Sequence, residues 1–536
     1  MQDVNDRRHE SVTTESIPDR PTVGINEPMN IKMTLPEALK TALKYQQSGN
    51  LREAEQIYRQ ILKIKPDQPD AWHLLGMLGH ECGLHDKAIE YIKRAIEYQP
   101  NNASFHRNLS LVYMKSDRPD LAETACRRAV ELTPNSAEAF NSLGNALQTQ
   151  CKMSEAMNAY AKAIELKPDF AMAHNNLANT YFGLGRPCDA IAEYDRALAL
   201  KPDYVCARVH RGISRLLDGQ FEAGWTDYEN RWQCEHWQAL LPNPRFPQPL
   251  TQPRWNGTPL GDRTLFVYTE QGLGDTLQFI RYLNHIPKDD GRIVFESHHA
   301  PLERIVGRMT CIDEVVAQGT VPSCDVHIPL LSLPGLLGTR VDSIPADGAY
   351  VDTDETLDRQ VRDVIGEVDD LKVGINWQGN PGFPRDRLRS VPLEQFIPLA
   401  DIPGIRWFSL QHGHGLDQLP KVSDHFPIID LGSRLDQLAE DACQESGPYR
   451  LDLAASAVSQ MDLVITTDTM MAHLAGALNQ RTWCLLPVAP DWRWLMNRND
   501  CPWYPAMRLF RQQEVGDWAS VIQRIRTALP DIHETR

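Results

Sequence analysis

The turn at residues 270–276, EQGLGDT, has residue types that could do chemistry, because it joins an apolar, strand-like stretch to a helix-like run. Gly272 and Gly274 permit a tight turn with exposed backbone, and Gln271 stands beside them. Asp275 is a candidate general base, since a carboxylate can take a proton from an incoming hydroxyl but repels a phosphate. The structural alternative is that Asp275 is the N-cap of a helix that begins at Thr276, with a Gln three residues later completing a capping box.

A second candidate site is the segment TDTMMAHLAGA, residues 467–477, which follows an expected strand and opens a short helix. A helix N-terminus carries free amides and partial positive charge, which suits a diphosphate. Thr469 and His473 are four residues apart and would share a helix face near that end, beside Met470. Asp468 has the wrong charge for a phosphate ligand, so it is expected to cap the helix or contact a ribose.

The third candidate is the loop at residues 378–390, QGNPGFPRDRLRS, whose arginines could clamp phosphate oxygens. These arginines are Arg385, Arg387 and Arg389. A solvated run of charge is the alternative interpretation. The loop's position after an expected strand favours a functional role, since loops at strand ends carry function more often than other surface segments.

Alternating strand and helix signals surround these segments and predict an α/β module with parallel sheets. In such sheets ligands bind at the carboxyl ends of the strands, which is where the three segments would lie. The expected strands are Thr264–Thr269, Arg292–Glu296, Lys372–Trp377, Arg406–Leu410, Asp462–Thr467 and Thr482–Leu486.

The N-terminal part has a different periodicity. Five prolines recur at a constant interval of 34 residues, which is the period of tetratricopeptide (TPR) helical repeats: Pro66, Pro100, Pro134, Pro168 and Pro202. Alanines of the second helix recur in phase at Ala54, Ala88, Ala122, Ala156 and Ala190. The pattern predicts an α-helical solenoid of five full repeats and a degenerate sixth that ends near Trp232 and either caps the array or packs on the C-terminal module.

A TPR solenoid has a concave groove that resembles a peptide-binding surface. Asn141 and Asn145, and one repeat later Asn175 and Asn179, are expected to line it, because an amide can pair with a peptide backbone as donor and acceptor together. Ordinary polar surface positions are the alternative.

Composition excludes several function classes. The 536 residues include 71 acidic and 55 basic side chains, which argues against a nucleic-acid or membrane-surface binder. No apolar stretch marks a signal peptide or a membrane span, so a soluble, cytoplasmic protein is expected. The 11 cysteines show no metal-ligand spacing and are interpreted as reduced structural thiols.

Together, the segments GLGDTLQF, VGINWQGNP with its following arginines, and DLVITTDTMMAHLAGAL resemble glycosyltransferase family 9, the heptosyltransferase-like enzymes. The whole chain looks like bacterial proteins that place TPR repeats before such a module. The resemblance runs from about Trp255 to Arg511 and is most specific at Asp468, Thr469 and the following His473.

The resemblance implies a GT-B arrangement, in which two Rossmann-like halves face each other across a cleft. It implies a nucleotide-diphosphate sugar as substrate, no cofactor and no obligatory metal. Carried over, Asp275 becomes the base, and Asp468, Thr469 and His473 belong to the donor site. The arginine loop stands where such enzymes place a cationic diphosphate contact, but the match is loose there and selects no single arginine.

Three features depart from the family or compete with it. The first half of the module is short for a Rossmann half. The aromatic segment 489–494, APDWRW, could stack on a base or sugar, although core packing is the commoner role of such tryptophans. Asp352 and Asp354 form a D-x-D triplet, the metal signature of another glycosyltransferase fold, but a helix cap explains them better.

The predicted organisation is a disordered tail at residues 1–32, TPR repeats at 33–235 and a proline-rich linker at 236–260. A first Rossmann-like half, on the acceptor side, follows at 261–355, and a second half, on the nucleotide-sugar side, at 356–530. The leading hypothesis is a metal-independent glycosyltransferase that transfers a sugar to a hydroxyl, with a protein acceptor or partner held in the TPR groove. The alternative is a non-catalytic TPR scaffold with a degenerate transferase-like module.

Overall fold

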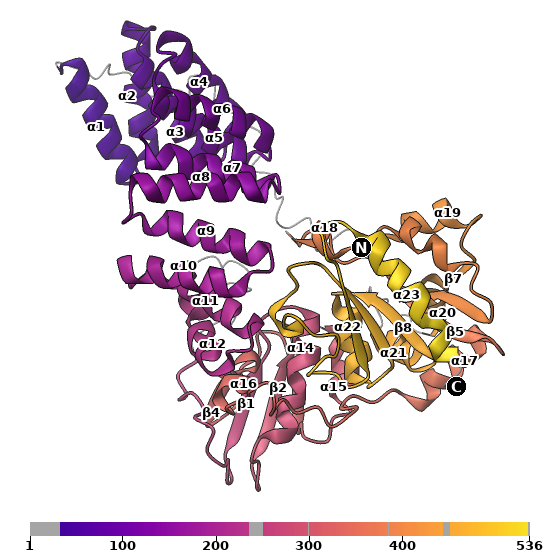
Figure 1. Ribbon diagram of the computed structural model, residues 1–536. Coiled ribbons are helices and arrows are strands. Elements are labelled where there is room, and N and C mark those ends of the chain that lie inside the picture. The colour runs from indigo at the N-terminus through magenta and orange to yellow at the C-terminus, as the bar shows by residue number, and fades with distance from the viewer. Residues whose placement is uncertain (1–32, 235–249, 298–299, 384, 443–450, 534–536) are drawn as a thin grey trace. The chain divides into compact units, whose positions relative to one another are not determined.

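A computed structural model describes residues 33–234, 250–297, 300–383, 385–442 and 451–533 (Figure 1). The chain forms two compact units, one ending at Thr180 and the other beginning at Tyr181. The expected tail at 1–32 and most of the expected linker lie outside the described residues.

The first unit is built from consecutive helix pairs that stack along the unit (Figure 1). Each of Pro66, Pro100, Pro134 and Pro168 lies two residues beyond the end of a second helix, which confirms the predicted period. The helices are α1 (Leu35–Gln47), α2 (Leu51–Ile64), α3 (Pro69–Glu81), α4 (His85–Tyr98), α5 (Ala103–Lys115), α6 (Pro119–Leu132), α7 (Ala137–Thr149), α8 (Met153–Leu166) and α9 (Ala171–Gly183), which crosses into the second unit.

Small residues let these helices approach closely. The repeated alanines Ala54, Ala88, Ala122 and Ala156 are each 0% exposed. A Cβ placed on Gly144 would lie 2.5 Å from the Tyr160 ring, so α7 and α8 are in contact at a position that only glycine fills without a shift.

The second unit begins with the remaining helices, α10 (Pro187–Leu200), α11 (Val205–Leu217), α12 (Phe221–Tyr228) and the 3₁₀ helix η1 (Glu229–Gln233). Of these, α11 and α12 pack on the α/β module that comes after them in the chain. The Trp225 indole donates to the Thr339 carbonyl at 3.0 Å, and the Phe221 ring stacks on Trp503 with centroids 6.2 Å apart. The predicted degenerate repeat therefore belongs to the compact unit that contains the sheets, whereas sequence patterns placed the boundary at residue 235.

The first sheet is parallel, with strand order β3-β2-β1-β4. Its strands are β1 (Thr264–Tyr268), β2 (Arg292–Ser297), β3 (Glu314–Ala317) and β4 (Val326–Pro329). One face packs against the helices that connect the strands, whereas Trp232 and Leu250 lie against Phe266, Tyr268 and Val294 on the other. The helices of this half are α14 (Leu273–Phe279), η2 (Ile280–His285), η3 (Ala300–Leu302), α15 (Glu303–Val306), η4 (Leu330–Ser332) and α16 (Leu333–Leu336).

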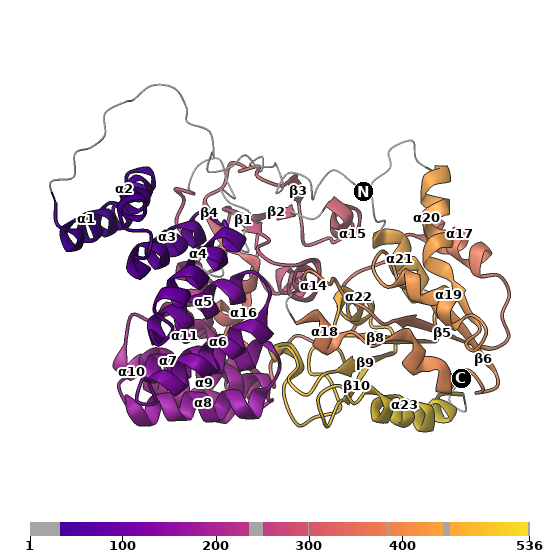
Figure 2. The same ribbon diagram turned by 90° about the horizontal axis from the view of Figure 1, so that it is seen from above.

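The second sheet is also parallel, with order β10-β9-β8-β5-β6-β7. Its strands are β5 (Leu371–Asn376), β6 (Ile405–Ser409), β7 (Ile428–Asp430), β8 (Leu463–Thr467), β9 (Thr482–Leu486) and β10 (Met507–Arg511). Figure 2 shows α23 (Trp518–His533) on one face, and α20 (Leu431–Ala442) and α21 (Leu451–Ser459) on the other. Further helical segments are α17 (Glu355–Ile365), α18 (Asp386–Arg389), η5 (Leu393–Leu399), η6 (Leu416–Gln418), α19 (Leu419–Val422), α22 (Met470–Ala477) and η7 (Trp492–Trp494).

The cysteine prediction was wrong at one pair. Cys206 in α11 and Cys234 just after η1 form a disulfide, with Cα atoms 5.3 Å apart. The two residues are 28 positions apart and have no spacing signature, because helix packing rather than sequence proximity brings them together.

Candidate functional site

The acidic turn follows β1 and opens α14, as predicted, but its cap differs from the predicted one. Gly272 is the N-cap residue and Asp275 lies in the first turn, where its Oδ2 accepts the Gly272 amide at 2.8 Å. Asp275 is therefore not the N-cap, because the helix begins at Leu273 rather than Thr276. Gln278 is 0% exposed and closes no capping box, so its side chain belongs to the helix packing.

The other residues of the turn are held from two directions. Gln271 Nε2 donates to the Tyr228 hydroxyl of α12 at 2.8 Å. A Cβ on Gly274 would lie 2.8 Å from His473 Cδ2 of α22. Gly274 thus lets the first turn of α14 pack directly against α22, and two of the sequence-predicted segments meet although they belong to different sheets.

Arg493 in η7 is the site residue that sequence patterns missed. Its guanidinium donates to Asp275 Oδ1 and, at 2.7 Å, to Asp491 Oδ1. Burial alone would lower the pKa of this guanidinium, but Asp491 and Asp275 outweigh burial and raise it, so Arg493 is a permanent cation here. The only signal was its place between two tryptophans, and Trp492 and Trp494 are 3% and 0% exposed, which confirms their core role.

The second predicted segment joins β8 to α22. Thr469 is the N-cap residue, but its hydroxyl donates to Asn376 Oδ1 at 2.9 Å instead of capping the helix. Asp468 is 8% exposed, and burial together with the neighbouring Asp491 raises the pKa of its carboxyl. Asp468 is thus not the helix cap, and Met470 beside it is half-buried.

His473 faces the core of the second unit. Its Nδ1 lies 2.9 Å from the Tyr504 hydroxyl, and its ring stacks on Trp494 with centroids 5.3 Å apart. Burial and the nearby Arg493 lower the pKa of His473 to about 3. The imidazole is therefore neutral at physiological pH and supplies no positive charge to an anion.

The three arginines of the third segment point to different partners. Arg389 Nη1 donates to the Asp468 carbonyl at 2.7 Å, which ties this loop to the start of α22. Arg385 Nη2 donates to the Ala489 carbonyl at 2.9 Å, and burial lowers the pKa of its guanidinium. Arg387 is exposed. The structure therefore distinguishes Arg389, which sequence patterns could not.

A glutamine holds the base of the arginine loop. Gln411, after β6, accepts the Trp377 and Gln378 amides on Oε1 at 3.1 and 3.0 Å, while its Nε2 donates to the His414 carbonyl at 2.8 Å. Because a single glutamine lacks a sequence signature, its role could be found only from the fold.

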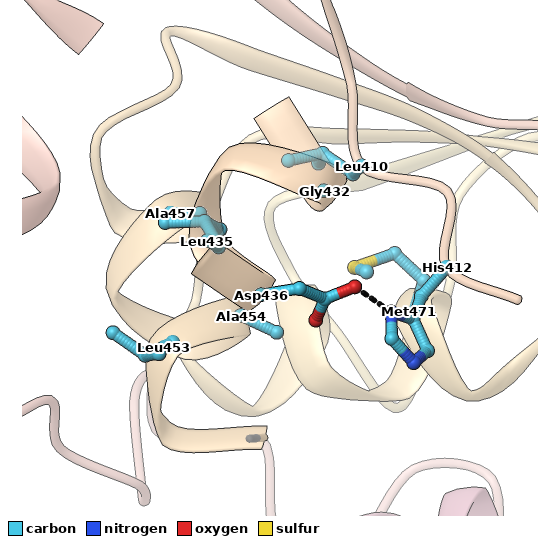
Figure 3. A pocket seen from close by; sticks show the side chains of 9 residues that line it. All are labelled: Leu410, His412, Gly432, Leu435, Asp436, Leu453, Ala454, Ala457 and Met471. Atoms are coloured by element: carbon cyan, nitrogen blue, oxygen red, sulfur yellow. Dashed lines mark ion pairs between the residues drawn. The ribbon is translucent and has the colours of Figure 1, made fainter. Parts of the chain in front are cut away.

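A small cavity lies beyond the carboxyl end of β6 (Figure 3). His412 points toward Asp436 with Nδ1 3.2 Å from Oδ2, and Leu410 and Met471 lie nearby. Its volume is about 30 Å³, which holds one or two water molecules and excludes a nucleotide base.

The predicted asparagines of the groove lie in the first unit, and three of them hydrogen-bond to Asn176: Asn141, Asn145 and Asn175. Asn176 Nδ2 donates to Asn141 Oδ1 at 3.1 Å and to Asn145 Oδ1 at 3.0 Å. Asn145 Oδ1 also accepts the Tyr160 hydroxyl at 2.7 Å. Asn141 and Asn175 are 4% and 6% exposed, and Asn179 is half-buried, so the structure adds Asn176 as the residue that joins the two repeats.

The D-x-D triplet caps a helix. Asp354 is the N-cap of α17 and accepts the amides of Thr356 and Leu357 at 2.9 and 3.1 Å, so the cap interpretation is confirmed. Within the described ranges, His, Cys, Asp and Glu form no cluster that could hold a metal ion. None of the helices in those ranges has the length and apolar character of a membrane span.

Comparison with known proteins identifies the repeats directly. Sequence models of the tetratricopeptide repeat match residues 39–100, 81–137 and 172–204, and a model described as TPR repeat matches 152–185. Protein FlbA of Caulobacter vibrioides is 26% identical over 351 residues, which cover 60% of this chain and 54% of FlbA. The chain therefore spans about half the length of this curated relative.

Several solved structures are also similar. A MamA structure is 26% identical, covers 32% of this chain and 97% of its own, and gives a TM-score of 0.29. YrrB, described as a TPR protein with an unusual peptide-binding site, is 25% identical, with coverages of 33% and 91% and a TM-score of 0.28. PilW, described as a type IV pilus biogenesis factor, is 19% identical. The match covers 37% of this chain and 90% of PilW, with a TM-score of 0.34. From the matched sequence models, this chain contains tetratricopeptide repeats in its N-terminal part.

Proposed function

We propose that this chain is a glycosyltransferase that moves a sugar from a nucleotide-diphosphate donor to a hydroxyl acceptor. The observation that supports this most is the contact between the turn after β1 and the helix after β8, where Gly274 packs on His473. Each segment follows the carboxyl end of a parallel strand, the position at which α/β sheets bind ligands. The two parallel sheets agree with a GT-B arrangement of two Rossmann-like halves.

The donor diphosphate would bind at the start of α22. That helix has no side-chain cap, so the amides of its first turn can bind an anion. Arg389 lies close to this helix end, because its guanidinium donates to the carbonyl of Asp468, the residue before the N-cap Thr469. The arginine and the helix end would stabilise the departing diphosphate as negative charge develops on it. Neutral His473 would hold α22 in place through its contacts with Tyr504 and Trp494, rather than bind the donor.

The acceptor hydroxyl would be deprotonated by Asp275. Asp275 is paired with Arg493, which occupies the carboxylate oxygen Oδ1 that the acceptor hydroxyl would need. Arg493 also has Asp491 as a partner. A donor diphosphate that attracts Arg493 would therefore free Asp275 for the acceptor, which couples proton removal to donor binding.

The TPR groove would hold a polypeptide that carries or brings the acceptor. The half-buried Asn145 and Asn176 offer amide groups to an extended backbone, since each amide retains hydrogen-bonding capacity beyond the bonds within the cluster. In this proposal the repeats select the protein and the second unit performs the transfer.

A TPR scaffold without catalytic activity is the second candidate. The ion pair between Asp275 and Arg493 favours it, because a buried pair of this kind can serve packing alone. Isothermal titration of the full chain with UDP, GDP, ADP and dTDP separates the two candidates. The transferase proposal expects one nucleotide to bind and Thr469→Ala to weaken that binding; absence of binding by all four supports the scaffold.

A further inference from the structure

A buried cluster joins the last helical segment to the acidic turn. Arg231 of η1 is 2% exposed and donates from Nε and Nη2 to the two carboxylate oxygens of Glu270, each at 2.7 Å. Its Nη2 also donates to Ser332 Oγ at 2.8 Å. Such a bidentate pair fixes both position and orientation, because the two parallel hydrogen bonds allow one geometry.

Glu270 lies two residues after β1 ends at Tyr268, so this pair fixes the start of the turn. Its Oε1 also accepts the Leu331 amide at 3.2 Å, and the next residue, Gln271, donates to the Tyr228 hydroxyl. The segment from Tyr228 to Arg231 therefore holds the entry of the turn that ends at Asp275. Removal of a partner would leave a buried charge unpaired, which is strongly destabilising.

The disulfide lies three residues beyond Arg231. Cys234 is 0% exposed and its partner Cys206, on α11, is half-buried. The bond attaches the end of η1 to α11 and closes a loop that contains α12 and η1 entirely. A cross-link there limits how far the backbone of Arg231 can move relative to α11.

Most of the other cysteines are free thiols. Eight further cysteines in the described ranges are thiols, and Cys82 and Cys188 among them are exposed. Eight free thiols beside one disulfide fit an environment that keeps cysteines reduced, and the disulfides found in such environments are usually transient or redox-sensing.

We propose that the Cys206–Cys234 disulfide is a redox-controlled cross-link that holds Arg231 against Glu270 and thereby fixes the turn at residues 270–276. Two thiols of a glutathione-class reductant break the S–S bond. The protein gains two electrons and two protons as two thiols, and the reductant leaves as its own disulfide. Reduction frees the end of η1, and the turn at 270–276 then opens more often. This inference does not depend on glycosyltransferase activity.

Hydrogen–deuterium exchange of the full chain, prepared in oxidised or in reduced glutathione, tests the proposal. Peptide mapping without reductant should recover the Cys206–Cys234 cross-link in the oxidised sample only. Amides of the peptide containing residues 270–276 should exchange roughly fivefold or more faster in the reduced sample, as expected for a weakened local unit. Peptides from α2 and α4 should exchange alike in both samples.

Three variants sharpen this test. Cys206→Ser should exchange like the reduced protein in both buffers, and Cys188→Ser, which removes an exposed thiol, should behave like the wild type. Arg231→Lys should show fast exchange in both buffers, because one ammonium cannot reproduce the bidentate pair. Should a variant fail to fold, the comparison of the two wild-type samples still decides. Two results would overturn the proposal. One is that Cys206 and Cys234 can both be alkylated in oxidised glutathione, which would show that they are thiols there. The other is that the amides of residues 270–276 exchange at the same rate in the oxidised and the reduced sample.

Discussion

Asp275 and Arg493 form an ion pair although they are 218 residues apart in sequence. Asp275 lies in the turn after β1 of the first sheet, and Arg493 follows β9 of the second. Their side chains are 21% and 7% exposed, so the carboxylate keeps some access to solvent while the guanidinium is buried. This pair joins the turn after β1 to the half of the unit built on the second sheet, and the proposed mechanism depends on its opening.

Arg493→Ala should destabilise the second unit by about 3–5 kcal/mol, because it leaves Asp275 and Asp491 without their shared cation. Urea unfolding followed by tryptophan fluorescence reports this unit, since Trp72 is the one tryptophan described in the first unit. Arg340→Ala is the control, because Arg340 is 70% exposed and its pair with Glu222 spans 4.0 Å. The control should stay within about 0.5 kcal/mol of the wild type. Equal losses in the two variants would contradict a structural role for the buried pair.

His473 should make stability fall as the solution becomes acidic. Its pKa is about 3 in the folded chain, against an ordinary 6.5, so the unfolded chain binds a proton that the folded chain does not. Stability is therefore lost as pH falls below 6.5, by about 1.5 kcal/mol between pH 6.5 and 5 from this group. His473→Gln should show a pH dependence of unfolding that is weaker by this amount, whereas His425→Gln, at an exposed position, serves as the control. Parallel curves for wild type and His473→Gln would show that the imidazole titrates in the fold.

Gly144→Ala should destabilise the TPR array by about 1–3 kcal/mol, because the added methyl group would meet the buried Tyr160 ring at 2.5 Å. Gly79 is a matched helical glycine where a Cβ would find Ala88 at an ordinary 3.7 Å. Gly79→Ala should be neutral or stabilise by up to about 1 kcal/mol through helix propensity. Thermal unfolding by circular dichroism distinguishes the two, and a larger loss for Gly79→Ala would refute the packing argument.

Arg389→Ala should weaken binding of the nucleotide diphosphate by roughly tenfold to a hundredfold, the effect of losing one charge-assisted contact. Arg387→Ala changes the same residue type two positions earlier, at an exposed site, and should have a smaller effect. Titration calorimetry with the nucleotide that binds the wild type measures both. An equal effect of the two substitutions would favour a diffuse electrostatic contribution over a contact made by Arg389.

The repeats could be predicted almost residue by residue, because helix spacing, alanine positions and proline stops follow from local chemistry. The six strands expected in the module are also present, with ends shifted by a residue or less. Strands β3, β4, β7 and β10 were missed; the first three have only three or four residues, too few to give a distinct period.

Long-range pairing explains why sequence patterns could not predict the rest of the site. The glycine-bearing turn was enough to predict Asp275 as a site residue. Its partner Arg493 could not be predicted, because the two residues meet only when the two sheets pack together. The same holds for Cys206 with Cys234, and for Arg231 with Glu270. In each case the pairing depends on packing between elements that carry no mutual sequence signal.

Sugar transfer by the full chain is the central claim, and release of nucleotide diphosphate from a panel of nucleotide sugars tests it most directly. The assay compares wild type with Asp275→Asn, in the presence and absence of cell extract as a source of acceptor. The account predicts release by the wild type from one donor, and loss of release in Asp275→Asn while binding of the corresponding nucleotide persists. Equal release by the two proteins would contradict the assignment of Asp275 as the base. No release from any donor, together with no nucleotide binding, would contradict the glycosyltransferase proposal as a whole.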